Sequence, residues 1–291
     1  MVQEESTGSA ENTYVVDIHN TAEITRLMSQ DRLVTRNMHG PLSECSDVSS
    51  LHTVLDLACG PGGWVLDLAH EHPEIQVTGV DIDKDLIKYA RAFARTQKRP
   101  NANFEVMNIL EPLAFADNSF DLVNARYIYG FMPQAAWTPL LQECRRILRP
   151  GGILRLTEPE WPISTSAACD RLTEMFTHAL YLAGRSFSPT GRHVGITPKL
   201  GYFLRQARFE RVQSVAHVLD YSAGTSEHAT YSNVLLLTFQ LLQPFLLQWK
   251  VATQEELTQL IQQAQIEMLA EDFCGVCYYL TVWGYKPFIQ A

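Results

Sequence analysis

The most constraining feature of this chain is an apolar run that ends in closely spaced glycines, VLDLACGPGGW, from Val54 to Trp64. A second apolar run, VTGVD, ends in a carboxylate at Asp81, about 20 residues after the glycines. In a doubly wound sheet, such a glycine-rich turn and such an acidic strand end form the cleft for a nucleoside. The pattern therefore predicts an α/β chain that binds an adenosine-containing cofactor.

The residue ahead of the glycines selects among such cofactors. Dinucleotide-binding folds use the spacing G-x-G-x-x-G, and the helix that follows receives a pyrophosphate at its N-terminus. In this chain Asp56 precedes the turn, and its carboxylate would repel a pyrophosphate. The same carboxylate suits a cofactor that carries an ammonium group and a sulfonium.

The order Asp56, Ala58, Gly60, Gly62 resembles motif I of the class I S-adenosylmethionine-dependent methyltransferases, usually written D/E-x-G-x-G-x-G. Ala58 stands where that family most often has its first glycine. One small residue replaces another there, so the turn remains plausible. For the glycines alone, an ordinary tight turn between a strand and a helix is the alternative interpretation.

The resemblance assigns the ribose and adenine contacts to the second strand. In the family, the acidic residue at this strand end accepts hydrogen bonds from both ribose hydroxyls, which implies that role for Asp81. It also places Ile82 against the adenine face. Asp83 is a weaker candidate for the ribose contact.

Three further segments follow in the order that the family shows. FEVMNIL contains Asn108, where relatives commonly place an aspartate that accepts from the adenine amino group, and Ile109 stands beside it. Asn108 can still accept through its amide oxygen, although without charge assistance. FADNSFDLVNAR, which ends at Arg126, resembles the family's fourth strand, and LRPGGIL, which ends at Leu154, resembles the turn and fifth strand.

The resemblance also implies positions for the methionine end of S-adenosylmethionine. The backbone of Asn124 would receive the ammonium group, and Arg126 would hold the carboxylate. A purely structural role is the alternative for Arg126. Arg26, in an expected leading helix, could reach the same carboxylate. A solvent-facing ion pair between Glu23 and Arg26 is the alternative for that position.

Methyl transfer requires little of the protein's side chains, because the sulfonium already makes the methyl group electrophilic. The protein supplies alignment and, for some nucleophiles, a base. We expect Glu158, at the end of the fifth strand, to face the cleft as a catalytic base, with Glu160 following it. A loop or helix-capping role is the alternative for these carboxylates. We expect Tyr129 to line the acceptor pocket.

The loop RSFSPTGRH, which ends at His193, gathers cations and an imidazole. His193 could act as a base near neutral pH, and the arginines could bind an acceptor carboxylate or phosphate. A solvated surface loop is the alternative interpretation.

Apolar segments with strand and helix periodicity alternate through the first half of the chain, which predicts a doubly wound, Rossmann-like α/β fold. We expect a mainly parallel seven-stranded sheet whose sixth strand is Arg211 to Tyr221. The resemblance makes the seventh, Cys274 to Tyr285, the antiparallel strand between strands five and six. A leading flap helix is expected from Thr21 to Asn37.

The predicted organisation has two parts. Residues 1–50 form an N-terminal extension with the flap helix, and residues 51–291 form a methyltransferase domain. Helical insertions are expected at about 161–207 and 222–272. The second insertion is the expected substrate lid.

Composition limits the classes of partner. The formal charge of -9 argues against a nucleic-acid substrate. No run reaches the about 18 to 20 apolar residues that a membrane span needs, and no signal peptide opens the chain, which predicts a cytoplasmic protein. Cys274 and Cys277 form a C-x-x-C without a second pair of metal-site spacing, so no metal is expected.

These observations favour a methyltransferase that uses S-adenosylmethionine, releases S-adenosylhomocysteine and acts on a small, largely apolar acceptor. The motifs are similar to those of ubiquinone and menaquinone methyltransferases, which implies a quinone-like or natural-product acceptor and a role in secondary metabolism. A cyclase or isomerase of the same fold that transfers no methyl stays open, as does an RNA or protein methyltransferase. The oligomeric state also stays open, with a homo-oligomer among the options.

Overall fold

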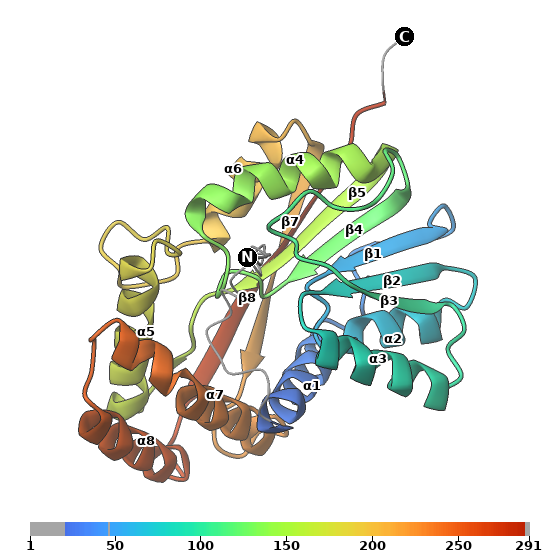
Figure 1. Cartoon of the computed structure of the whole chain (residues 1–291). Coiled ribbons are helices and arrows are strands. Elements are labelled where there is room, and N and C mark those ends of the chain that lie inside the picture. The colour runs from blue at the N-terminus through green and yellow to red at the C-terminus, as the bar shows by residue number, and fades with distance from the viewer. Residues whose placement is uncertain (1–20, 46, 289–291) are drawn as a thin grey trace, which may run out of the picture.

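The computed structural model describes residues 21–45 and 47–288, in which one mixed sheet is covered by helices on both faces (Figure 1). The strand order is β3-β2-β1-β4-β5-β8-β6, and β7 also pairs with β8. The strands are β1 (Thr53–Leu57), β2 (Gln76–Asp81), β3 (Ala102–Val106), β4 (Phe120–Arg126), β5 (Leu148–Pro159), β6 (Ile163–Ser164), β7 (Glu210–Asp220) and β8 (Gly275–Tyr285). The helices are α1 (Thr21–Asn37), α2 (Gly63–Glu71), α3 (Lys84–Thr96), the 3-10 helix η1 (Gln134–Ala136), α4 (Trp137–Ile147), α5 (Ala167–Leu182), α6 (Thr197–Gln206), α7 (His228–Gln248) and α8 (Gln254–Met268).

The central strands are mainly apolar on both faces because helices cover both sides of the sheet. In β1, Val54 belongs to the hydrophobic cluster of α2 and α3, whereas Leu55 and Leu57 belong to the larger cluster of α4 and α6. The edge strand β7 shows the contrasting pattern, since most of its residues are exposed or half-buried. The predicted doubly wound fold is confirmed.

The last strand is antiparallel, as the resemblance implied. β8 lies between β5 and β7, and both of these pair with it in antiparallel register. The expected sixth strand is β7. The sheet has one strand more than the seven predicted, because the two-residue β6 pairs with the beginning of β8.

Local capping sets where the helices begin. The Asp83 side chain accepts hydrogen bonds from the backbone N–H groups of Asp85 and Leu86, so it caps α3. This contact explains Asp83, the weaker ribose candidate, as a helix cap. The Thr253 hydroxyl accepts from the N–H of Glu256 and caps α8 in the same way.

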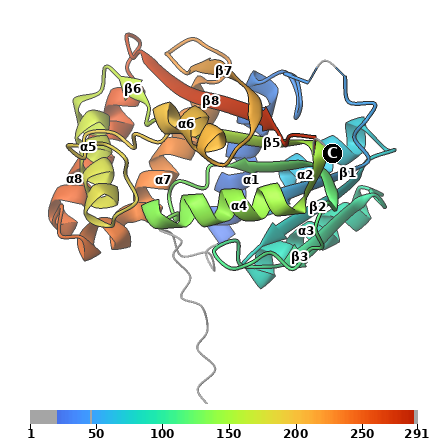
Figure 2. The ribbon, with the colours of Figure 1, turned by 90° about the horizontal axis from the view of Figure 1, so that it is seen from above.

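The helices α5, α7 and α8 gather in a group at one end of the sheet (Figures 1 and 2). Helix α1 lies between this group and α2, and it packs against α7. Helices α5 and α6 fall in the first expected insertion and α7 and α8 in the second, while the division of the chain at residue 50 stays a prediction. Residues 1–20 of the expected extension lie outside the described residues. None of the helices in the described part of the chain combines the length and apolar character needed to cross a membrane.

Candidate cofactor and acceptor site

The glycine-rich turn after β1 is built from residues with left-handed backbone. The φ angles are +53° at Ala58, +54° at Gly60 and +83° at Gly62. A side chain in this region costs about 1 to 2 kcal/mol, which explains why a glycine suits the position of Ala58. A Cβ atom at Gly62 would collide with Phe104, whereas one at Gly60 would meet only Leu27, at 3.9 Å. Packing therefore requires glycine at position 62, and the space beside Gly60 is open to a ligand.

Asp81 lies at the end of β2, directly behind this turn. Its Oδ2 accepts a hydrogen bond of 2.8 Å from the N–H of Gly60, and its Oδ1 accepts one of 2.9 Å from the N–H of Asp83. Burial raises the pKa of Asp81. Each carboxylate oxygen has a second lone pair, so Asp81 can fix the turn and still accept from a ligand. Ile82 follows it and is half-buried.

Asn108 lies after the end of β3, and its side chain is engaged in the local turn. Its Oδ1 accepts from the N–H of Leu110 at 3.0 Å, and its Nδ2 donates to Glu111 at 3.2 Å. Ile109 is buried in the larger hydrophobic cluster. The amide oxygen proposed for the adenine contact is therefore already an acceptor within the chain.

The glycine turn and α1 enclose a cavity, which we call the cofactor cavity. One face of α1 supplies part of the lining, with the helical spacing i, i+3, i+4 and i+7. The residues that line the cavity are Leu27, Gln30, Asp31, Val34, Asp56, Ala58, Cys59, Gly60, Pro61, Gly63, Trp64, Arg126 and Tyr127. Asp31 is the residue that the sequence analysis missed, and its helical spacing from Leu27 is the signal that could have indicated it.

The cofactor cavity carries charges of both signs. Arg126 forms an ion pair with Asp31 and donates to the Thr35 hydroxyl at 3.1 Å. Burial raises the pKa of Asp56 to about 7, although Arg126 lowers it, and burial also raises the pKa of Asp31. Burial likewise raises the pKa of nearby Asp67, to about 6. Two carboxylates and one guanidinium can receive the ammonium and carboxylate groups of an amino acid.

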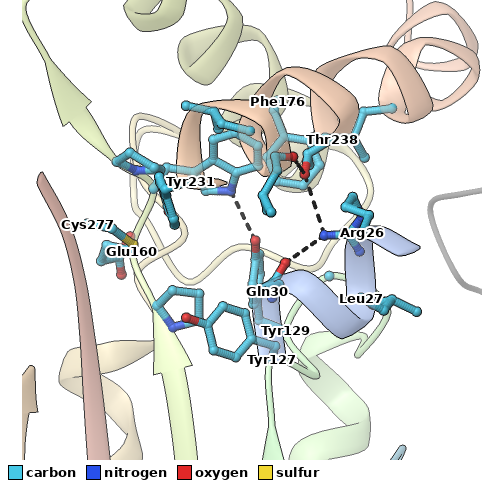
Figure 3. Close-up of a pocket in the computed structure, with 17 residues that line it drawn as sticks. Arg26, Leu27, Gln30, Tyr127, Tyr129, Glu160, Phe176, Tyr231, Thr238 and Cys277 are labelled. Atoms are coloured by element: carbon cyan, nitrogen blue, oxygen red, sulfur yellow. Dashed lines mark hydrogen bonds between the residues drawn. The ribbon is translucent and has the colours of Figure 1, made fainter. Parts of the chain in front are cut away.

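Arg26 points away from this cavity. Its guanidinium pairs with Glu23 at 2.6 Å. It also donates to Gln30 at 2.6 Å and to Thr238 of α7 at 3.5 Å (Figure 3). The expected pair with Glu23 is present, but it is buried and not solvent-facing, since the exposed fractions of the two side chains are 7% and 0%. Arg26 thus connects α1 to the lid helix.

A second cavity of about 130 Å³, which we call the acceptor cavity, lies between α1, the loop after β4 and the lid helices (Figure 3). Its lining is mainly apolar and contains five aromatic side chains, Tyr127, Tyr129, Trp161, Phe176 and Tyr231. Leu27, Gln30 and Tyr127 line both cavities. The two cavities therefore meet at these three side chains.

Tyr127 has an unusual backbone at this junction. Its φ is +59°, a left-handed conformation that a bulky residue rarely adopts. Such strain is found at ligand-binding sites, where the surrounding structure holds it. Tyr127 lines both the cofactor cavity and the acceptor cavity.

Comparison with known proteins assigns the central part of the chain. The model of a methyltransferase domain family matches residues 54–152. A protein of Aspergillus luteorubrus named "Probable methyltransferase ltbC" is 39% identical over 108 residues, which cover 35% of this chain and 38% of that protein. Demethylmenaquinone methyltransferase of Lactococcus lactis is 30% identical over 130 residues, which cover 43% of this chain and 50% of that enzyme. The matched region spans half or less of these relatives.

A solved structure extends the likeness to most of the fold. Phosphoethanolamine N-methyltransferase 2 of Haemonchus contortus, in complex with phosphomonomethylethanolamine and S-adenosylhomocysteine, superposes with a TM-score of 0.54 and 17% identity. The superposition covers 87% of this chain and 52% of that enzyme. Residues 54–152 thus match a methyltransferase domain, and the fold around them is that of class I methyltransferases. The cofactor of this class is S-adenosylmethionine, as the resemblance implied.

Glu158 does not line the acceptor cavity. Its side chain is fully buried, and its carboxylate accepts from the backbone N–H groups of Ile128 at 3.0 Å and Tyr129 at 3.3 Å. Burial raises its pKa to about 8. The structure therefore gives Glu158 the loop-holding contact that was the alternative to a base.

Glu160 lines the acceptor cavity, but its carboxylate is held by residues 194–197, where the loop between α5 and α6 ends. Its carboxylate accepts from the N–H groups of Val194 at 3.0 Å and Gly195 at 2.9 Å, and from the hydroxyl of Thr197 at 3.1 Å. His193 is exposed and lines a different cavity, which shares Glu160, Trp161 and Pro162 with the acceptor cavity. The structure does not bring His193 to the acceptor cavity.

Tyr129 is the predicted catalytic candidate that does line the acceptor cavity of the methyltransferase domain. Its hydroxyl oxygen accepts a hydrogen bond of 3.0 Å from the indole N–H of Trp161 (Figure 3). Because an indole N–H can only donate, the tyrosine oxygen must accept, and its own proton points elsewhere. No hydrogen bond from that proton is seen to the residues that the structure describes.

Asn124 lies in β4, two residues before the carboxyl end of the strand. Its backbone is in register with Asp56 of β1 on one side and Arg155 of β5 on the other. Its side chain is fully buried and donates to Asp56 at 2.7 Å. The structure therefore connects Asn124 to the cofactor cavity through Asp56.

The cysteine pair shows no metal-site geometry. Cys274 is exposed and Cys277 is buried, and both are free thiols. Within residues 21–45 and 47–288, no group of three or more histidine, cysteine or acidic side chains is arranged to hold a metal ion.

Proposed function

We propose that this protein transfers the methyl group of S-adenosylmethionine to a small, largely apolar acceptor that binds in the aromatic acceptor cavity. The observation that carries the proposal is the shared wall of Leu27, Gln30 and Tyr127 between the two cavities. A cofactor in the first cavity would present its methyl group at this wall. In-line attack needs the acceptor atom within about 3 to 3.5 Å of the methyl carbon, and the second cavity offers such a position.

The cofactor is proposed to bind along the carboxyl edge of the sheet. Its ribose would bind Asp81, its backbone would pass Gly60, and its ammonium group would meet Asp56 and Asp31. Its carboxylate would bind Arg126, in competition with Asp31. The open space beside Gly60 and the mixed charges of the cavity support this placement.

The acceptor is proposed to be a ring system that carries an oxygen atom. Aromatic walls favour stacking of planar rings, and the free hydroxyl proton of Tyr129 suits a carbonyl or phenolate oxygen. The quinone named in the relative from Lactococcus lactis agrees with this class. An acceptor of this kind ionises readily at oxygen or at the adjacent carbon, which reduces the need for a strong base.

Two measurements test the proposal in sequence. Calorimetric titration with S-adenosylmethionine and S-adenosylhomocysteine should show binding that is lost in Asp81→Ala. Incubation with methyl-labelled S-adenosylmethionine and a panel of naphthols and hydroxynaphthoquinones should then place the label on one of them. Failure of the intact protein to bind either cofactor form would overturn the proposal.

The remaining alternatives correspond to other outcomes of the same assay. Conversion of an acceptor without label transfer would support a cyclase or isomerase, and label in RNA or protein would support a macromolecular substrate. The acidic net charge of -9 argues against RNA. The cytoplasmic location and the oligomeric state stay predictions.

A further inference from the structure

A chain of four buried polar side chains crosses the sheet below the cofactor cavity. Asp56 of β1, Asn124 of β4 and Arg155 of β5 stand in register on one face of the sheet. Glu44, from the segment that follows α1, pairs with Arg155. The exposed fraction is 4% for Asp56 and 0% for Asn124 and Arg155. Buried polar groups on this scale need complete hydrogen bonding.

The hydrogen bonds along this chain fix the orientation of the central amide. Arg155 donates from one guanidinium nitrogen to Oδ1 of Asn124 at 2.6 Å. A guanidinium can only donate, so the amide must present its oxygen to Arg155 and its NH₂ group to the other side. That NH₂ group donates to Oδ1 of Asp56 at 2.7 Å. This oxygen of Asp56 must therefore be an unprotonated acceptor.

We propose that Arg155 is a positioning residue for cofactor binding. By fixing the amide of Asn124, it holds Asp56 as an acceptor whose second oxygen meets the ammonium group of S-adenosylmethionine. Arg155 itself does not line the cofactor cavity. The inference rests on the cofactor placement proposed above, and it adds a role for a strand residue outside the cavity.

The charged groups around Asp56 make its ionisation sensitive to the orientation of the Asn124 amide. Asp31 from α1 carries a like charge, Arg126 of β4 and Arg155 of β5 carry opposite charges, and the Cys59 thiol lies in the turn above. Burial raises the pKa of Asp56 to about 7 in spite of these cations. Near neutral pH, loss of the hydrogen bond from Asn124 would therefore lower the ionised fraction of Asp56.

The experiment measures the affinity for S-adenosylhomocysteine by calorimetry from about pH 6 to pH 8.5. Asn124→Leu removes the donor to Asp56, and the pH midpoint of binding should rise by about one unit. Affinity should fall about fivefold near pH 7 and recover at higher pH, because the carboxylate still ionises there. A variant that had merely lost its fold would not recover.

Arg155 is tested with its charge balance preserved. Arg155→Met is combined with Glu44→Gln, so that no unpaired carboxylate is buried and the net charge is unchanged. The amide of Asn124 can then turn its oxygen toward Asp56, which favours the protonated acid. The pH midpoint of S-adenosylhomocysteine binding should rise by about one unit or more.

A double-mutant cycle separates orientation from simple charge. If Arg155 acts through Asn124, adding Asn124→Leu to the Arg155→Met, Glu44→Gln pair should raise the midpoint no further than Asn124→Leu does alone. Additive shifts, or affinity losses that do not depend on pH, would overturn the role of Arg155.

The matched control is Thr157→Val. Thr157 is fully buried on the same strand and face as Arg155, and it hydrogen bonds with Thr281 at 2.9 Å, away from Asp56. The pH midpoint of binding in Thr157→Val should equal that of the unaltered protein. Absence of S-adenosylhomocysteine binding in the unaltered protein would overturn the proposed function as well, whereas binding with unshifted midpoints in the variants would overturn this inference alone.

Discussion

The two cavities of this protein are built in different ways. The largest part of the cofactor cavity's lining comes from one segment, Asp56 to Trp64, which relies on backbone conformation, with left-handed residues at Ala58, Gly60 and Gly62. The acceptor cavity takes its lining from α1, the loop after β4, the end of β5, α5, α7 and β8. The difference shows why a local motif can indicate a cofactor while the acceptor stays unnamed.

The largest expected effect is at the centre of the cofactor motif. Gly60→Val places a branched side chain in the open space beside the turn, at a φ of +54°, and should abolish cofactor binding in calorimetry. Gly224→Val is the matched control, since Gly224 has a φ of +86° and equally open surroundings. Equal binding by both variants would make the turn merely structural.

Asp81→Ala should have the next largest effect. It removes charge-assisted hydrogen bonds to the ribose and the acceptor for the N–H of Gly60, so binding should weaken by about 1 to 3 kcal/mol. Calorimetry with S-adenosylhomocysteine measures the change. Asp81→Asn, which keeps the shape of the side chain, should lose less affinity than Asp81→Ala. An unchanged affinity in Asp81→Ala would remove Asp81 from the cofactor site.

Cofactor binding should also depend on pH, through the ionisation of Asp56 in the cofactor cavity. Burial raises the pKa of Asp56 to about 7, and an ammonium ligand binds its ionised form. Affinity for S-adenosylhomocysteine should therefore be constant above this pKa and fall by about tenfold per pH unit as the pH drops below it. Asp56→Asn should flatten this part of the profile. A flat profile in the unaltered protein would separate Asp56 from the ammonium group.

The smallest expected effect belongs to the acceptor cavity. Tyr129→Phe removes the hydroxyl that is proposed to hold the acceptor oxygen, so kcat/KM for an oxygen-bearing ring should fall by about fivefold, equivalent to about 1 kcal/mol. Cofactor affinity should not change. A loss of cofactor affinity in this variant would show that the two cavities are not separate in function.

Much of the cofactor side could be predicted from the sequence. The alternation of strands and helices is confirmed, because periodicity determines it locally. The antiparallel last strand, which the resemblance implied, is confirmed as well. The resemblance places Asp81 at the end of β2, where the structure has it. Asp56 and Arg126 line the same cavity, while their roles as cofactor ligands stay predictions.

The carboxylates of the fifth strand show where such prediction ends. Glu158 follows the strand pattern that would direct it to the cleft, yet it binds two backbone N–H groups of the loop after β4. Glu160 is held by the loop of residues 194–197. Whether a strand-end carboxylate meets a ligand or a backbone depends on segments that pack against it from elsewhere in the chain.

The sequence by itself determined the backbone of the cofactor turn, because glycines and strand periodicity act over a few residues. The ion pair of Asp31 in α1 with Arg126 depends on the tertiary structure. So do the hydrogen bonds from Arg155 to Asn124 and from Asn124 to Asp56. These contacts join residues from about 30 to 100 positions apart, which nothing in a local pattern specifies. The buried charges find partners there because isolation from water makes an unpaired charge costly wherever the fold brings it.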